Sequence, residues 1–316
     1  MTALPVRRAF DLDAQPQEKR WLIEGLWSAE AVGIVGGEPK CCKSFLALDM
    51  AVAVASGTPC LRRFPAVQRG TVLLFAAEDS LAVVRERLCG IAMAAGLDLE
   101  ALDVHVIVAP VVRLDVELDQ RRLEETVRAL KPVLLVLDPF VRLHRIDENV
   151  SAEVAPLLDY LRGLQRRYKV AVVLVHHARK GASHLRPGQA LRGSSELHAW
   201  GDSNLYLRRN SENELSLQIE HRAAACVDGL ALALTTQGDA LALRVVDSAM
   251  PAAAAEATLG PLERVERILA EAAAPMSQRE VRDLAKIRAA SVSDALAALV
   301  ADGRAERVDG KYRLLR

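Results

Sequence analysis

The residues from Gly36 to Ser44, GGEPKCCKS, combine glycine, lysine and a hydroxyl in an order that suits phosphate binding. They follow an apolar run, Ala31–Val35, and precede a helical pattern, Ser44–Ala55, so they should connect a strand to a helix. At such a junction the N–H groups of the helix N-terminus surround phosphate oxygens, a lysine reaches the outer phosphates and a serine hydroxyl holds Mg²⁺. Lys43 and Ser44 suit the last two roles. We assign the nucleotide contacts to Gly37, Glu38, Pro39, Lys40, Cys41, Cys42, Lys43, Ser44 and Phe45.

This loop departs from the pattern GxxxxGK[ST] because Cys42 stands where the pattern has glycine. If the backbone is left-handed there, a side chain costs about 1–2 kcal/mol, which would weaken nucleotide binding about tenfold. The adjacent thiols of Cys41 and Cys42, at a helix N-terminus beside Lys43, are also expected to have a lowered pKa and to oxidise readily. The alternative interpretation of the loop is a glycine-poor turn with a chance Lys-Ser pair.

Three acidic residues follow two further apolar runs. Glu78 and Asp79 come directly after Val72–Ala77, and Asp138 comes directly after Val133–Leu137. Because ligands of an open α/β sheet bind at the carboxyl ends of its strands, these side chains and the phosphate loop should share one crevice. We assign Asp138 to Mg²⁺, together with the loop serine, and Glu78 to the activation of an attacking water. Taken singly, these residues could merely begin a turn or cap the next helix.

A fourth apolar run, Val170–Val175, ends in His176 and His177. One imidazole at this strand end could sense the terminal phosphate of a nucleotide, and we assign that role to His177. Buried histidines bonded to backbone carbonyls are the alternative. The next segment, 178–195, carries basic residues among glycine and serine and suits a loop that contacts a charged polymer, with a solvated loop as the alternative.

The pattern of apolar runs predicts the fold class. Buried runs alternate with helical patterns between residues 20 and 180, which indicates an α/β domain built on a mainly parallel sheet. Later segments are short, are separated by Asn-Ser, Asp-Gly and Gly-Asp turns, and predict antiparallel strands that extend this sheet. The later strands are expected at 203–209, 213–221, 230–236 and 240–246, and the helices at Ser44–Ala55, Leu81–Ala95 and Ala152–Tyr168, the last with Ser151 as its N-cap.

The end of the chain predicts a linker and a second, smaller domain. Residues 248–261 are rich in alanine and proline, and residues 262–316 show three helix patterns and a hairpin that favour a winged-helix fold. The third helix, 290–301, has no lysine or arginine, so base reading in the major groove is not expected, although basic wing residues could touch DNA phosphates. A protein-docking module is the alternative. We therefore divide the chain into an N-terminal extension (1–20), the α/β domain (21–247), the linker (248–261) and the winged helix (262–316).

Composition excludes several classes of protein. With 51% hydrophobic and 26% charged residues, the chain is not disordered as a whole. Its 41 Lys+Arg balance its 41 Asp+Glu, so a nucleic-acid contact would need a local basic patch. The five cysteines show no CxxC spacing and favour a reducing compartment. No apolar stretch approaches the roughly 20 residues of a membrane span, so we expect a cytoplasmic protein with no membrane partner.

The motifs together resemble a known family. The stretches GIVGGEPKCCKSFLALDMAVAVASG, TVLLFAAEDS, VLLVLDPF, VVLVHHARKG and ALRGSS, in this order, are similar to the RecA-like ATPases typified by the plasmid replicative helicase RepA, close to the DnaB-type helicase core. The resemblance covers about residues 20–246 and implies a RecA-like P-loop NTPase core that uses ATP and Mg²⁺. It also implies a homo-oligomeric ring, with a hexamer favoured, that acts on single-stranded DNA.

The resemblance implies roles for single residues as well. Glu78 would be catalytic, Asp138 would coordinate magnesium, and His177 or its neighbour would be a sensor, beside the phosphate-binding Lys-Ser pair. Ring ATPases of this kind complete each site with an arginine from the neighbouring subunit, worth about 10³–10⁵ in turnover. Arg222 is the nearest counterpart in this chain, although it lacks the lysine of the usual Lys-x-Arg, and the Arg208-Arg209 pair is a second candidate.

Two functions from different classes follow from these observations. The first is an ATP-hydrolysing ring coupled to DNA, with a helicase or remodelling role in replication, mobile elements or defence. The second is a nucleotide-binding scaffold or regulator, catalytically weak because of Cys42, that recruits a protein through its winged helix. A plain winged-helix transcription factor would leave the first 246 residues unexplained.

Overall fold

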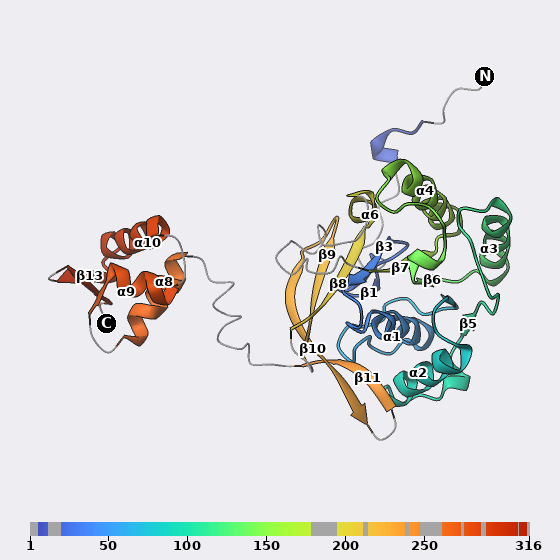
Figure 1. Cartoon of the computed structure of the whole chain (residues 1–316), viewed down its shortest axis with the longest axis horizontal. Coiled ribbons are helices and arrows are strands. Elements are labelled where there is room, and N and C mark those ends of the chain that lie inside the picture. The colour runs from blue at the N-terminus through green and yellow to red at the C-terminus, as the bar shows by residue number, and fades with distance from the viewer. Residues whose placement is uncertain are drawn as a thin grey trace. The chain divides into compact units, whose positions relative to one another are not determined.

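The computed structural model of the chain describes residues 6–11, 20–177, 195–210, 214–237, 240–246, 261–272, 275–285, 289–308 and 310–314. The chain divides into two compact units, Met1–Val246 and Asp247–Arg316, which we describe separately (Figure 1). The predicted basic loop lies outside the described residues from 178 to 194. Most of the predicted linker lies outside them as well.

A nine-stranded sheet runs through the described part of the first unit. Its strands are β3 (Val32–Gly37), β4 (Val72–Ala76), β5 (Val104–Val106), β6 (Leu134–Asp138), β7 (Ala171–His177), β8 (Ser203–Arg209), β9 (Leu215–His221), β10 (Val227–Gln237) and β11 (Ala240–Val245). Their order is β11-β10-β9-β8-β3-β7-β6-β4-β5. Neighbours from β8 to β5 are parallel, and neighbours from β8 to β11 are antiparallel. The predicted α/β class, with an antiparallel extension of a mainly parallel sheet, is confirmed.

Helices cover both faces of this sheet (Figure 1). The helices are α1 (Lys43–Ser56), α2 (Leu81–Ala94), α3 (Glu117–Leu130), α4 (Ser151–Tyr168) and the short α6 (Ser195–Trp200). Successive strand residues point to opposite faces, so Leu74 packs in the core beneath α1 and α2, and Leu73 packs in the core beneath α3 and α4. The two cores hold the sheet between two helical layers, which fixes the carboxyl ends of β3, β4, β6 and β7 relative to one another.

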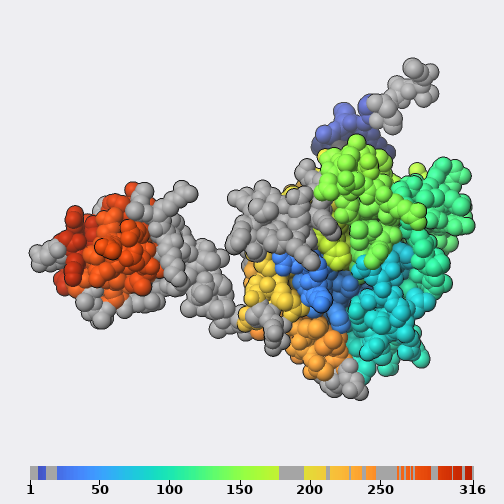
Figure 2. Space-filling model, in the orientation of Figure 1, coloured from blue at the N-terminus to red at the C-terminus, as the bar shows by residue number. Residues whose placement is uncertain are grey.

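The helix α1 is apolar along most of its length because it is enclosed by the sheet, α2 and β11. It ends at Ser56, and its C-cap is Gly57, whose φ of 83° is left-handed and whose N–H donates to the Ala53 carbonyl. In the space-filling view, the blue surface around β3 and α1 lies between the cyan surface of α2 and the yellow and orange antiparallel strands (Figure 2). The sheet thus presents the start of α1 beyond the carboxyl end of β3.

Several local predictions were wrong or incomplete. Ser151 is the first residue of α4 rather than its N-cap, and the N-cap, Val150, makes no side-chain capping bond. In contrast, Ser80 caps α2 by accepting a hydrogen bond from the Val83 N–H. The helix α3 and the strand β5 were not predicted, and neither was a two-stranded hairpin, β1 (Trp21–Ile23) and β2 (Trp27–Ser28), which precedes the sheet.

The second unit contains three helices and a three-stranded antiparallel sheet among its described residues. They are α8 (Pro261–Glu271), α9 (Gln278–Ala285), α10 (Ala289–Ala301), β12 (Met276–Ser277), β13 (Ala305–Val308) and β14 (Lys311–Leu314), with the strand order β12-β14-β13. Val265, Val281 and Leu296, one from each helix, meet in its apolar core. None of the helices described in either unit is long and apolar enough to cross a membrane.

Candidate active site

The loop between β3 and α1 has an unusual backbone. Lys40 and Cys42 each have a φ of 64°, which is left-handed. Cys42 is the N-cap of α1, and its side chain accepts no hydrogen bond from the first helical turn. The N–H groups of that turn are therefore available to an anion, and the dipole of α1 favours one there. The Cβ of Cys42 sits on the strained backbone that the sequence pattern would give to glycine.

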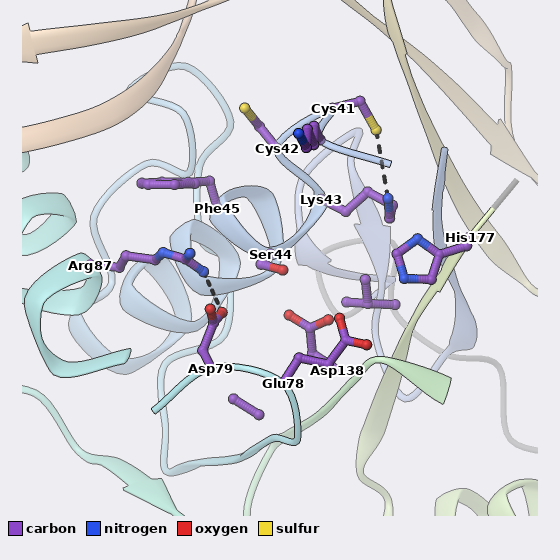
Figure 3. Close-up of a pocket in the computed structure, with 13 residues that line it drawn as sticks. Cys41, Cys42, Lys43, Ser44, Phe45, Glu78, Asp79, Arg87, Asp138 and His177 are labelled. Atoms are coloured by element: carbon purple, nitrogen blue, oxygen red, sulfur yellow. Dashed lines mark hydrogen bonds and ion pairs between the residues drawn. The ribbon is translucent and has the colours of Figure 1, made fainter. Parts of the chain in front are cut away.

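Lys43 is held inside the loop. Its side chain is 5% exposed, and its Nζ donates to the Glu38 carbonyl over 2.8 Å. The Cys41 Sγ lies 3.8 Å from the same Nζ (Figure 3). The ammonium group thus stands where a loop-bound phosphate would need it, with a backbone carbonyl as its present partner.

The expected lowered pKa of the two thiols is wrong. Burial is the main cause that raises the pKa of both Cys41 and Cys42 above the usual value for a thiol. The nearby charges of Lys43 and Arg209 act in the opposite direction but do not overcome the loss of solvation. Both cysteines are therefore mainly neutral thiols at neutral pH, and the hypothesis of a readily oxidised P-loop fails on this point.

Asp138 and Glu78 meet at the ends of two neighbouring strands. Asp138 is the last residue of β6 and pairs in register with Ala76 of β4, so Glu78 follows only two residues beyond that pair. The N–H of Ala77 donates to the Asp138 carbonyl over 2.7 Å, which ties the two strand ends together. In Figure 3 both carboxylates lie near the Ser44 hydroxyl.

Asp138 is 8% exposed, and this burial raises its pKa to about 6. The negative charges of Asp79 and Glu78 add to the rise. A hydrogen bond from Ser44 and the charge of Lys43 oppose it. Buried carboxylate and hydroxyl oxygens with an excess of negative charge are a donor set that fits Mg²⁺, so Asp138 and Ser44 are the residues that would hold it.

Two arginines form ion pairs with the other two carboxylates of the site, Asp79 and Glu78. Arg87 of α2 forms an ion pair with Asp79, and its guanidinium lies 5.2 Å from the centre of the Phe45 ring. The Nε of Arg142 donates to the Glu78 Oε1 over 2.9 Å. Neither arginine was predicted for the site. In the case of Arg87, nothing in the sequence distinguishes it from the other arginine on α2.

The loop between β3 and α1, the three carboxylates and Arg87 surround a cavity of about 280 Å³ (Figure 3). It is lined by Lys40, Cys41, Cys42, Lys43, Ser44, Phe45, Ala76, Glu78, Asp79, Arg87, Asp138, Val175 and His177. Most of the assigned nucleotide contacts are therefore on its wall, together with Glu78, Asp138 and His177. Gly37, Glu38 and Pro39 do not line it, and Arg222 does not either.

The two histidines at the end of β7 have separate environments. His177 is half-buried in the cavity wall, and burial, with the charge of Lys43, lowers its pKa. His176 is 1% exposed and packs edge-on against Phe140, with 5.9 Å between ring centres. Of the two, His177 is the one that can contact a ligand in this cavity.

Arg222 and Arg209, the candidates for the arginine that would complete the site of a neighbouring subunit, have different surroundings. Arg222 follows β9, donates to the Ala199 carbonyl over 2.5 Å and pairs with Asp202 over 3.3 Å, away from the cavity. Arg209 ends β8 and donates to the Lys40 carbonyl of the phosphate loop over 2.6 Å. Arg222 is therefore outside the cavity of its own chain, whereas Arg209 contacts the phosphate loop of its own chain through a hydrogen bond.

Comparisons with known proteins show the family and the fold of this chain. Residues 2–183 match the family described as AAA domain. The structure is similar to a solved structure described as an ATPase domain, with a TM-score of 0.53 and 16% identity over 68% of this chain and 86% of that one. It is equally similar, at a TM-score of 0.53 and 16% identity over 68% of this chain, to a DnaB-like replicative helicase described with its interactions with primase, of which it spans 57%. The chain belongs to the AAA domain family, and its α/β unit has the RecA-like P-loop fold of helicase ATPase domains.

Proposed function

We propose that this chain binds ATP with Mg²⁺ and hydrolyses it as an oligomeric RecA-like ATPase coupled to DNA. The observation that supports this most is the convergence of Lys43, Ser44, Glu78 and Asp138 on one cavity of about 280 Å³. A cavity of that size is at the small end of ligand pockets, which suits the triphosphate part of a nucleotide better than the whole molecule. The family membership and the RecA-like fold agree with an ATPase.

The residues of the cavity divide the work of phosphoryl transfer. The loop N–H groups and Lys43, once released from the Glu38 carbonyl, would hold the phosphates. Ser44 and Asp138 would hold Mg²⁺, which neutralises charge on the phosphate oxygens. Glu78 would accept a hydrogen bond from the attacking water and orient it. His177, half-buried and lining the same wall, would contact the terminal phosphate.

Assembly and DNA belong to the proposal as well. The similarity to a DnaB-like replicative helicase supports a homo-oligomeric ring, with a hexamer favoured, that acts on single-stranded DNA. Arg222 lies outside the cavity of its own chain, which is where an arginine must lie if it is to serve a neighbouring site. A helicase or DNA-remodelling role is the part of the proposal that the similarity to a replicative helicase supports.

For the second unit we propose a winged-helix domain that binds a protein partner. The basic residues of the predicted wing are Arg304, Arg307, Lys311 and Arg313. Two of them form ion pairs within the unit, Arg304 with Glu266 and Arg313 with Glu306. The exposed side of α10 offers Ser293 and Asp294 but no cation. Charges neutralised within the unit contribute little to DNA phosphate binding, so a protein partner is favoured over DNA.

A calorimetric titration of Mg·ATP into the full chain tests the core of the proposal. We expect saturable binding by the wild type, strong loss with Lys43→Ala, and unchanged binding with Lys311→Ala in the second unit. ATP turnover measured with and without single-stranded DNA then tests the coupling. Binding without turnover would favour the scaffold function, and absence of binding would refute both functions.

Replacement of Cys42 by glycine is expected to distinguish the effect of backbone strain at this position from obstruction of the cavity by the thiol. The backbone at Cys42 is left-handed, so a strain of about 1–2 kcal/mol belongs to the fold of the loop itself, and its relief should appear in stability. We expect Cys42→Gly to raise the free energy of unfolding by about 1 kcal/mol, net of the entropy that glycine adds to the unfolded chain. Any gain in ATP affinity, up to about tenfold, would come from removing the thiol from the cavity wall.

Thermal unfolding and calorimetric titration of Cys42→Gly and Cys42→Ala check this prediction. The alanine variant keeps the Cβ on the left-handed backbone and removes only the sulfur. It should therefore share the affinity gain and lack the stability gain. Equal stability of the two variants would show that the backbone strain is negligible.

The pKa of Asp138, about 6, predicts a pH dependence of Mg²⁺-nucleotide binding. The protonated carboxyl cannot bind the cation, so affinity should fall as the pH drops below about 6, by up to about tenfold per pH unit. Titrations between pH 5 and 7.5 measure this change. The nucleotide phosphates and His177 also titrate, and Asp138→Asn supplies the control because it retains their contributions and lacks that of Asp138. Parallel pH profiles for the two proteins would contradict the prediction.

A further inference from the structure

Arg142 lies on a rigid turn directly after the metal-binding strand end. The turn is a 3₁₀ helix, η4 (Phe140–Arg142), that begins two residues beyond Asp138. Phe140 and Leu143 are both fully buried, and the Leu143 carbonyl accepts a hydrogen bond from the Leu114 N–H over 2.6 Å. The backbone that carries Arg142 is therefore fixed on both sides of the arginine.

From this turn Arg142 reaches Glu78 across 64 residues of sequence. Its Nε donates to the Glu78 Oε1 over 2.9 Å, with 61% of the arginine side chain and 42% of the glutamate side chain exposed. Arg142 does not line the cavity, whereas Glu78 does. The arginine thus holds one carboxylate oxygen from outside while the glutamate remains in the cavity wall.

The contact between Arg142 and Glu78 offsets the repulsion between Glu78 and the neighbouring carboxylates. Glu78, Asp79 and Asp138 line one cavity, and the charges of Glu78 and Asp79 help to raise the pKa of Asp138. Asp79 has Arg87 as its partner, and Lys43 donates to a backbone carbonyl of the loop. Among the described residues, the ion pair that the structure gives to Glu78 is the one with Arg142.

We propose that Arg142 is a positioning residue for Glu78, which it holds at the cavity wall against the neighbouring carboxylates so that the second carboxylate oxygen can orient the attacking water. This inference rests on the proposed ATP hydrolysis and adds to it a residue that touches neither nucleotide nor metal. Loss of Arg142 should leave the nucleotide site formed and leave Glu78 poorly placed. Turnover should therefore fall while affinity is kept.

Arg142→Ala in the full chain tests this role. We expect the rate of ATP hydrolysis at saturating ATP to fall by about five- to a hundredfold. The lower limit corresponds to the loss of an exposed ion pair, and the upper limit corresponds to a misplacement of the Glu78 carboxylate by about 1 Å. The calorimetric affinity for Mg·ATP should stay within about twofold of wild type. Arg142→Lys, which keeps a cation, should recover part of the lost rate. Arg145→Ala removes an exposed arginine three residues further on and should change neither quantity.

The outcomes are distinct. Equal loss of affinity and rate in Arg142→Ala, with no recovery in Arg142→Lys, would show a merely structural turn and overturn the inference. An unchanged rate would overturn it as well. In the Glu78→Gln background, Arg142→Ala should cause no further loss, and an additional loss of similar size would show that the arginine acts elsewhere. If the wild type itself hydrolyses no ATP, the proposed function fails first and the inference fails with it.

Discussion

Glu78→Gln is expected to lower the rate of ATP hydrolysis by about 10²–10⁴-fold and to leave the affinity for Mg·ATP nearly unchanged. Glutamine preserves the shape of the side chain and its place in the cavity wall but cannot accept the proton of an attacking water. Asp138 and Ser44, which would hold the metal, and Lys43, which would hold the phosphates, are not altered. The loss should therefore appear in the chemical step rather than in binding.

A turnover assay at saturating Mg·ATP, with calorimetry on the same samples, measures both quantities for Glu78→Gln. Glu86→Gln is a matched control, because it makes the same replacement at an exposed position of α2. An unchanged rate in Glu78→Gln would show that another group activates the water. Background turnover in wild type and variant alike, with ATP still bound, would leave the scaffold function.

The second large effect concerns stability, at Gly33 of β3. A Cβ at this position would lie 1.7 Å from the Ser203 carbonyl oxygen of the neighbouring strand and 2.9 Å from the Trp27 ring. Since the carbonyl belongs to backbone, the two strands would have to separate. We expect Gly33→Ala to lower the free energy of unfolding by about 3 kcal/mol or more, at the upper end of overpacking effects.

Gly163→Ala makes the same substitution at another position and is expected to have the opposite effect on stability. This residue lies on an exposed side of α4, and a Cβ there would meet nothing within 4 Å. Alanine should therefore stabilise the helix by up to about 1 kcal/mol. Chemical denaturation of both variants measures the difference. A Gly33→Ala protein as stable as the wild type would show that β3 and β8 are not in such close contact.

The sequence was sufficient to predict the elements that carry the site because each has a strong local signal. Buried strands such as β6 and β7 read as unbroken apolar runs, and the residues that follow them could be placed at one sheet edge from topology alone. The helix α3 gave no such signal, since only Leu123 and Val127 of its residues are buried and most of the others are charged. The strand β5 has three residues, none of them buried, and was missed for the same reason.

The site was predictable to the extent that its residues follow strands. Glu78, Asp138 and His177 all lie at strand ends and all line the cavity. Arg87 and Arg142 reach the site through side chains from a helix face and a turn, and their partners depend on tertiary packing that no local pattern encodes. The thiol pKa was mispredicted because a helix N-terminus and a lysine were considered without the burial that outweighs them.

The strand β8 lies between β3, which leads into the phosphate loop, and the outer antiparallel strands. Its last residue, Arg209, donates to the Lys40 carbonyl within that loop. Besides this contact, β8 pairs with β3 at Leu205, Tyr206 and Leu207, along the residues that lead into the loop. The antiparallel extension is therefore joined to the loop backbone both through the sheet and through Arg209, so substitutions in the outer strands can alter the loop without touching the cavity.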